Sequence, residues 1–194
     1  MRSIVLASSS PYRRELLARL HLDFQIERPD VDERPLPGEV PTATALRLAQ
    51  LKAEAVGAHH ANALVIGSDQ VAELDGSAVG KPGSFDAALA QLERMQGRVV
   101  VFQTALVLLD TRDGRIQKEN VPTTVRFRRL PRGALEAYLR IDTPFDCAGS
   151  AKIESAGIAL VESVDSSDPT ALVGLPLIRL TSMLTNCDVD VPPR

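Results

Sequence analysis

Strand-like and helix-like segments alternate along this chain, and this alternation constrains the fold more than any other feature. The apolar runs ALVIG (63–67) and RVVVFQTALVLLD (98–110) are typical of interior strands, while residues 42–57 carry helical spacing. A turn expected at Asp113-Gly114 makes one of the connections antiparallel. We therefore predict an α/β protein with a long mixed β-sheet flanked by helices.

The composition is that of a globular chain with a sizeable core, because 44% of its 194 residues are hydrophobic. No linker or repeat divides it. We expect a single domain over residues 1–194, bilobed, with a central cleft that binds the ligand. The formal net charge of −3 argues against nucleic acid as a partner, because nonspecific phosphate binding needs a basic face.

The two cysteines, Cys147 and Cys187, lie far apart and lack metal-ligand spacing, which favours a reducing, cytoplasmic environment. The first apolar run is too short for a signal peptide, and no run approaches membrane-spanning length, so no membrane association is expected. His21, His59 and His60 are the only histidines, and the last two are expected at a solvated helix end. With no HExxH or GxSxG motif, catalysis must depend on carboxylates, lysines and arginines.

The segment LASSSPYRREL (6–16) joins a predicted strand to a predicted helix. Ser10 suits the helix N-cap and Pro11 its first turn, so unpaired backbone N–H groups point outward. Arg13 and Arg14 add positive charge at the same helix end, which is favourable when an anion binds there. A plain capped helix followed by charged residues is the alternative.

Three further charged residues occupy unusual places. Lys52 falls on the apolar face of its predicted helix, so it either snorkels past the core edge or points into a cleft. Asp69 is expected at the end of the strand ALVIG, where a carboxylate is desolvated unless it meets a cation, a metal or a donor; a turn or capping role is the alternative. Lys81 lies between Gly80 and Pro82 and is either a ligand-binding residue or a plain surface lysine.

The motifs LASSSPYRREL, VDE, RLAQLKA, IGSDQV, GKP, CAGS and VGLPL occur in this order over nearly the whole chain. Together they resemble the Maf family of nucleoside triphosphate pyrophosphatases. The resemblance implies a mixed α/β fold with a cleft, like that of the ITPases, and hydrolysis of a nucleoside triphosphate to monophosphate and pyrophosphate. It also suggests a homodimer.

The resemblance assigns roles to the charged residues. It implies that Ser8 and Arg13 hold the triphosphate, and that Lys52 and Lys81 neutralise its charge during catalysis. Such cations spread the charge that develops when water attacks the α-phosphorus.

Two carboxylates complete the catalytic set that the resemblance implies. Glu33 and Asp69 would bind a divalent metal, Mg²⁺ or Mn²⁺, and manage the attacking water. A carboxylate suits this work because it can orient and deprotonate water.

Tyr12, Gln70 and Glu154 match the branch of the family that acts on 7-methyl-GTP. The branch that acts on dTTP and UTP typically has arginine, threonine and glutamine there. A methylated N7 makes the purine cationic, so the Tyr12 face would gain ~0.5–2 kcal/mol from a cation–π contact. Glu154 would accept hydrogen bonds from the guanine N1–H and 2-amino groups, or else merely lie at the rim.

Two other functions stay open from the sequence. One is a dTTP or UTP pyrophosphatase of the same family. The other is a nucleotide-binding regulator of cell division that needs no turnover, although the set of Asp69, Lys52 and Lys81 argues against it because binding alone requires no base.

Overall fold

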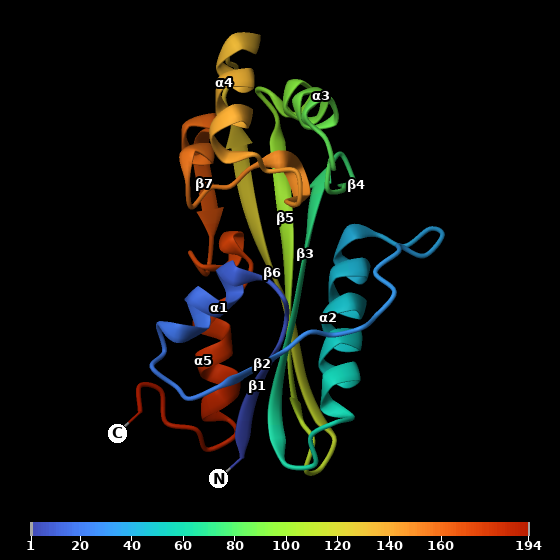
Figure 1. The fold of residues 1–194 in the computed structure, drawn as a ribbon, viewed down its shortest axis with the longest axis vertical. Coiled ribbons are helices and arrows are strands. Elements are labelled where there is room, and N and C mark those ends of the chain that lie inside the picture. Colours follow the sequence, from blue (N-terminus) through green and yellow to red (C-terminus); the bar gives the residue numbers. More distant parts are fainter. Residues whose placement is uncertain (1, 194) are drawn as a thin grey trace.

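A computed structural model describes residues 2–193, and within this range seven strands form a single sheet flanked by helices (Figure 1). The predicted α/β class with a long mixed sheet is confirmed. In chain order the elements are β1 (Ser3–Ala7), α1 (Pro11–Ala18), β2 (Gln25–Glu27), α2 (Pro41–Gly57), β3 (Ala63–Leu74), β4 (Ser77–Val79), α3 (Phe85–Met95), β5 (Val99–Asp110), β6 (Arg115–Phe127), α4 (Arg132–Asp142), the 3₁₀ turns η1 (Ala148–Ser150) and η2 (Ala156–Leu160), β7 (Val161–Ser166), η3 (Ala171–Val173) and α5 (Leu177–Thr185).

The sheet has the order β2-β1-β3-β5-β6-β7, with β4 paired to β3 outside this path. Strands β2, β1 and β3 are parallel to one another, whereas β3, β5, β6 and β7 pair antiparallel. The long strands β3, β5 and β6 run the length of the molecule (Figure 1). The expected turn at Asp113-Gly114 joins β5 to β6, with Gly114 at φ +74°.

Helices cover both faces of the sheet around β1. Ile4 and Leu6 pack with α1 and α5 on one face, while Val5 and Ala7 pack against α2 on the other. This division follows from the strand period of two, which sends successive side chains to opposite faces. The helix predicted over residues 42–57 is α2, which begins one residue earlier.

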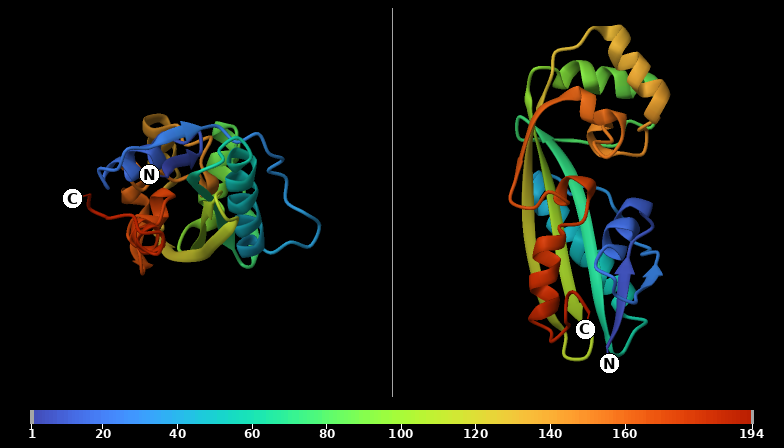
Figure 2. Two further views of the ribbon diagram at one scale, coloured as in Figure 1. Left: turned by 90° about the horizontal axis from the view of Figure 1, so that it is seen from below. Right: turned by 90° about the vertical axis from the view of Figure 1, so that its left-hand side faces the viewer.

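The other end of the long strands is covered by α3 and α4, which pack together over a separate apolar cluster (Figure 2). Gly67 in β3 lies under α2, where a Cβ atom would come within 2.1 Å of the Ala49 carbonyl oxygen. Glycine therefore lets α2 approach β3 closely. Lys52 of α2 is consequently brought to the polar part of β3.

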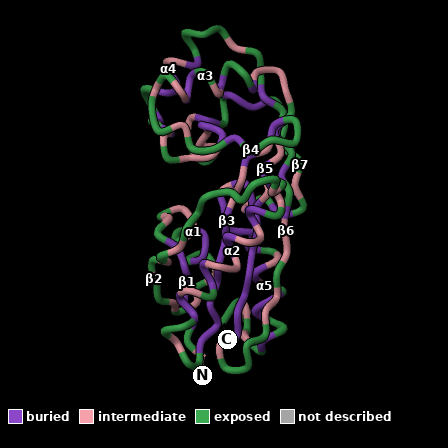
Figure 3. The backbone as a smooth tube through the Cα atoms, turned by 90° about the vertical axis from the view of Figure 1, so that its right-hand side faces the viewer, coloured by how far each residue is buried: buried purple, intermediate pink, exposed green. Residues whose placement is uncertain are grey.

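The predicted end of one strand is wrong. Asp69 does not end its strand: β3 continues to Leu74, and Asp69 pairs with Ala105 in the middle of the sheet. The strand persists because the residues after Asp69 still pair with β5, and most of β3 is buried (Figure 3).

Residues 2–193 contain no helix that is long and apolar enough to cross a membrane. The bilobed division and the single-domain boundary at 1–194 stay predictions.

Candidate active site

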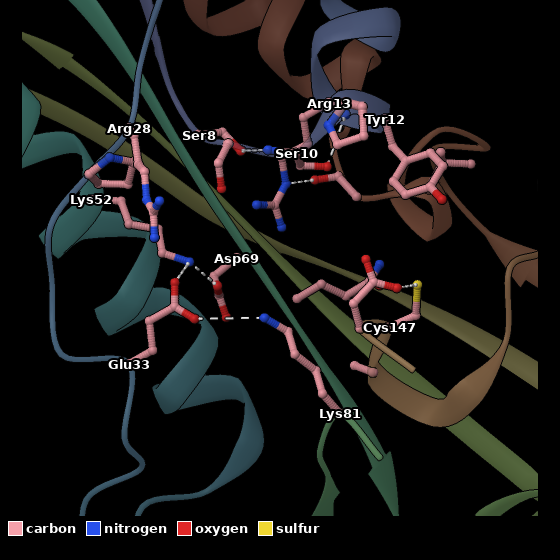
Figure 4. Close-up of a pocket in the computed structure, with 18 of the residues that line it drawn as sticks. Ser8, Ser10, Tyr12, Arg13, Arg28, Glu33, Lys52, Asp69, Lys81 and Cys147 are labelled. Atoms are coloured by element: carbon pink, nitrogen blue, oxygen red, sulfur yellow. Dashed lines mark hydrogen bonds and ion pairs between the residues drawn. The ribbon is translucent and has the colours of Figure 1, made fainter. Parts of the chain in front are cut away.

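The nine residues to which the family resemblance assigns a role all line one pocket, with a volume of about 490 Å³, whereas Arg14 does not line it. They come from the β1–α1 junction, the β2–α2 loop, α2, β3, the loop before α3 and the loop before η2 (Figure 4). The nine are Ser8, Tyr12, Arg13, Glu33, Lys52, Asp69, Gln70, Lys81 and Glu154. The structure thus places these residues together, while their individual roles stay predictions.

Lys52 lies between two carboxylates. Its Nζ is 2.6 Å from Asp69 Oδ1 and 2.7 Å from Glu33 Oε1, and its side chain is only 6% exposed. The interpretation of Lys52 as a snorkelling lysine is therefore wrong, because its charge is directed inward. The pKa of Glu33 is lowered overall: burial would raise it, but the hydrogen bond and charge of Lys52 outweigh that effect.

Asp69 retains a free acceptor. Its Oδ1 receives the Lys52 hydrogen bond, and Oδ2 has no hydrogen-bond partner within residues 2–193. The residue lines the pocket although it is only 8% exposed. One oxygen is thus fixed by Lys52, and the other is available to a water or a metal ion.

The N-terminus of α1 has the predicted Ser10 cap with Pro11 in the first turn, whereas anion binding there stays a prediction. Ser10 caps the helix by accepting from the Arg13 N–H, and Ser8 Oγ accepts from the Ser10 N–H. Arg13 Nε donates to the Gly174 carbonyl at 2.8 Å, which holds the guanidinium at the pocket wall. Burial lowers the Arg13 pKa and the charges of Asp69 and Glu33 oppose this, so the side chain stays cationic near neutral pH.

Lys81 approaches the Glu33 carboxylate, which also contacts Lys52, from the opposite wall of the pocket. Its Nζ lies 3.9 Å from Glu33 Oε2, with the lysine side chain 64% exposed (Figure 4). A contact this exposed contributes little to stability. Lys81 is therefore free to move to a phosphate when one binds.

Gln70 presents an acceptor to the pocket. Its Nε2 donates to Thr104 Oγ1 at 2.9 Å and to the Ala171 and Leu172 carbonyls at 3.0 Å. The two carbonyls can only accept, so they fix the amide orientation. The carbonyl oxygen of Gln70 is then the group left for a ligand, and it complements N–H donors.

The loop that carries Glu154 is fixed to α4. Asp142 accepts hydrogen bonds from Ser155 Oγ at 2.8 Å and from the Gly157 N–H at 3.1 Å, and its backbone oxygen accepts from Lys152 Nζ at 3.0 Å. Burial raises the pKa of Glu154, and the charge of Asp142 adds to this shift while Lys152 opposes it. Glu154 lines the pocket and is exposed, as a residue at the pocket rim would be.

Tyr12 stands on the other side of Asp69 from the β2–α2 loop (Figure 4). It interacts with Lys152: burial would lower the Lys152 pKa, but a side-chain hydrogen bond with Tyr12 helps to raise it. Tyr12 belongs to α1, so this contact links α1 to the loop that carries Glu154.

Sequence reasoning missed four charged or nucleophilic residues that line the pocket, namely Arg28, Asp30, Asp146 and Cys147. Arg28 and Asp30 lie in the proline-rich loop after β2, where charged residues usually face solvent, so no local pattern marks them. Cys147 is a poor nucleophile, because burial and the neighbouring Asp146 raise the pKa of its thiol to about 12.

His59 and His60 follow the end of α2 as expected, with His59 exposed and His60 partly buried. They lie 2.7 and 2.8 Å from the two carboxylate oxygens of Glu27 at the end of β2. The histidines therefore anchor the start of the β2–α2 loop and lie outside the pocket lining.

No group of three or more His, Cys, Asp and Glu residues is arranged to hold a metal ion in the described range 2–193. Asp69 Oδ2 and the half-exposed Glu33 are nevertheless suitable oxygen donors. Mg²⁺ is commonly held by one or two carboxylates together with substrate phosphates and water. The donor set thus fits a metal that arrives with a triphosphate.

The fold and this pocket define an α/β protein with a candidate active site in which carboxylates and cations meet. A family profile described as Maf-like protein matches residues 3–187, and the chain belongs to that family. A relative from Cupriavidus metallidurans, named 7-methyl-GTP pyrophosphatase, is 60% identical over 182 residues, which cover 94% of this chain and 92% of the relative. Proteins of the same name from Ralstonia nicotianae and Thiobacillus denitrificans are 62% and 58% identical, covering 94% and 97% of this chain and 94% of each relative.

Proposed function

We propose that the chain hydrolyses 7-methyl-GTP to 7-methyl-GMP and pyrophosphate and so removes a modified nucleotide from the pool. The observation that carries this function is the Lys52 ammonium, held between Asp69 and Glu33 in a pocket that all the predicted residues line. The names of relatives at about 60% identity support the substrate. No covalent nucleophile is needed.

The reaction uses water as the nucleophile. Asp69 Oδ2 orients a water and accepts its proton as the water oxygen attacks the α-phosphorus, and the bond from that phosphorus to the bridging oxygen breaks. Lys52 fixes the Asp69 carboxylate, while Arg13 and Lys81 neutralise the phosphate oxygens. Pyrophosphate leaves with the electron pair of the broken bond.

Asp69 and Glu33 would hold a divalent ion, Mg²⁺ or Mn²⁺. When bound, that ion would neutralise phosphate charge and act as a Lewis acid. Activity is therefore expected to disappear with a chelator and to return with the added metal. The homodimer and the cytoplasmic location remain proposals, to be tested by light scattering and by cell fractionation.

Base selection depends on the end of the pocket formed by Tyr12, Gln70 and Glu154. The Gln70 carbonyl oxygen and the Glu154 carboxylate both accept hydrogen bonds, which matches the N1–H and 2-amino donors of guanine. The ring of Tyr12 offers its face to the cationic purine. A pyrimidine would leave these acceptors without partners.

A panel of 7-methyl-GTP, GTP, dTTP and UTP tests the proposal, with pyrophosphate and inorganic phosphate measured separately. We expect pyrophosphate from 7-methyl-GTP as the preferred substrate. Single phosphate as the first product would contradict the reaction, and a preference for dTTP or UTP would instead support the other branch. Binding without turnover in the presence of metal would support a regulator.

The same panel tests the base pocket through the triple variant Tyr12→Arg, Gln70→Thr, Glu154→Gln. It should lose most 7-methyl-GTP hydrolysis and gain on dTTP or UTP. The carboxylate is replaced by a neutral amide that both donates and accepts, and the aromatic face is removed, while the phosphate chemistry is kept. An equal loss on every triphosphate would show that these residues do not form the base pocket.

A further inference from the structure

Arg28 is a pocket-lining cation with no partner. It lies directly after β2, its side chain is exposed, and within residues 2–193 it makes no hydrogen bond or ion pair. Among the other pocket cations, Lys52 binds Asp69 and Glu33, Arg13 donates to the Gly174 carbonyl, and Lys81 keeps an exposed contact of 3.9 Å with Glu33. Asp30 also lines the pocket but forms no ion pair with Arg28 in the described part of the chain.

Arg28 and Tyr12 lie on opposite sides of Asp69, the proposed catalytic base. Figure 4 shows Arg28 on the Lys52 side of Asp69 and Tyr12 on the other side. A nucleotide whose base lies at Tyr12 and whose α-phosphorus lies at Asp69 therefore extends its remaining phosphates toward Arg28.

The loop that carries Arg28 is fixed where it begins. Glu27, the preceding residue, binds His59 and His60 at the end of α2, and Pro29 restricts the backbone on the other side. The Arg28 backbone is thereby held at the pocket, while its side chain stays solvated. An arginine in this position suits a phosphate group, since its planar guanidinium donates two parallel hydrogen bonds.

We propose that Arg28 binds the β- and γ-phosphates of the substrate, and hence the pyrophosphate that departs. This inference rests on the proposed function, because that proposal is what places the base at Tyr12 and the attacked phosphorus at Asp69. Arg28 is then a substrate-binding residue for the leaving group, distinct from the groups that contact the attacked phosphorus.

Product inhibition separates this role from a general loss of activity. The variants are Arg28→Ala and Arg28→Lys, assayed with 7-methyl-GTP in Mg²⁺ and with pyrophosphate or 7-methyl-GMP as the inhibitor. Removing a charge-assisted hydrogen bond should raise the inhibition constant of pyrophosphate by roughly 10- to 100-fold in Arg28→Ala. The inhibition constant of 7-methyl-GMP should not change, and Arg28→Lys should fall between wild type and Arg28→Ala.

Arg34→Ala is the matched control. Arg34 is on the same loop and 87% exposed, but it binds Asp32 at 2.6 Å and does not line the pocket. The substitution removes the same charge, so it reports the general electrostatic effect of losing a cation from this loop. Arg34→Ala should leave both inhibition constants near the wild-type values.

Three outcomes would overturn the proposal. They are an unchanged pyrophosphate inhibition constant in Arg28→Ala, an equal rise for both products, and an equal effect in Arg34→Ala. Failure of the proposed function is recognised separately, because wild-type protein would then release no pyrophosphate from 7-methyl-GTP.

Discussion

Replacing Lys52 with methionine removes the cation between Asp69 and Glu33 but keeps most of the apolar stem. Removing one partner of a buried ion pair typically costs about 3–5 kcal/mol, because the remaining charge stays buried. We expect about 3 kcal/mol here, the lower end, because Asp69 lines an open pocket and Glu33 is half-exposed. At about 2–4 °C per kcal/mol for a chain of this size, the melting temperature should fall by about 6–12 °C.

The double variant Lys52→Met, Asp69→Asn distinguishes stability from activity. Neutralising Asp69 removes the uncompensated charge, so the double variant should recover about 1–2 kcal/mol relative to Lys52→Met alone. Its activity should not recover, since it lacks both the proton acceptor and the cation that positions it. A role in proton transfer is typically worth about 10²–10⁴-fold in rate.

Urea unfolding and initial rates of pyrophosphate release measure the two effects on the same protein preparations. Lys118→Met is the control, because Lys118 is exposed and its ammonium has Gln50 Oε1, at 3.2 Å, as its one partner within residues 2–193. It should change stability by less than about 0.5 kcal/mol. The reasoning is refuted when Lys52→Met is as stable as this control, or when Asp69→Asn adds to its destabilisation instead of relieving it.

Two further predictions concern the close approach of α2 to β3, which positions Lys52, and the ionisation of Glu33. Gly67→Ala should destabilise the protein by about 1–3 kcal/mol and lower the turnover number, because the added Cβ would force α2 away from β3. Gly133→Ala is the control, since a Cβ there meets nothing within 4 Å. It should leave the turnover number unchanged, and stability unchanged or slightly improved. Glu33 has a pKa below its ordinary value of 4.5 in the folded protein, so its stabilising contribution is present above that value and is lost as the pH falls below it. The difference in unfolding free energy between wild type and Glu33→Gln should therefore be constant near neutral pH and shrink below about pH 4.5; a difference that grows toward acid would contradict the assigned shift.

The fold was predictable from the sequence where one physical pattern dominates. The helical spacing of residues 42–57 and the apolar run at 98–110 each admit one regular structure, and α2 and β5 match them. The end of β3 was not predictable, because polar Ser68 and Asp69 interrupt the apolar run although their backbone still pairs with β5. Backbone hydrogen bonds between strands can continue a strand past polar residues, as long as the polar side chains find hydrogen-bond partners.

In the candidate site, sequence reasoning detected a buried charged residue but missed an exposed one. Lys52 was detectable because a charge on an apolar helix face requires a partner, and the partners it finds are residues far away in sequence. Arg28 gives no such signal: an exposed loop arginine needs no partner, so its position beside the pocket emerges only from the folded chain. Sequence reasoning therefore finds the groups whose burial must be compensated, and it misses those that stay solvated until the substrate binds. In this protein the residue that was missed, Arg28, lies where we expect the leaving pyrophosphate. Inhibition by pyrophosphate therefore tests the part of the site that no local sequence pattern predicts.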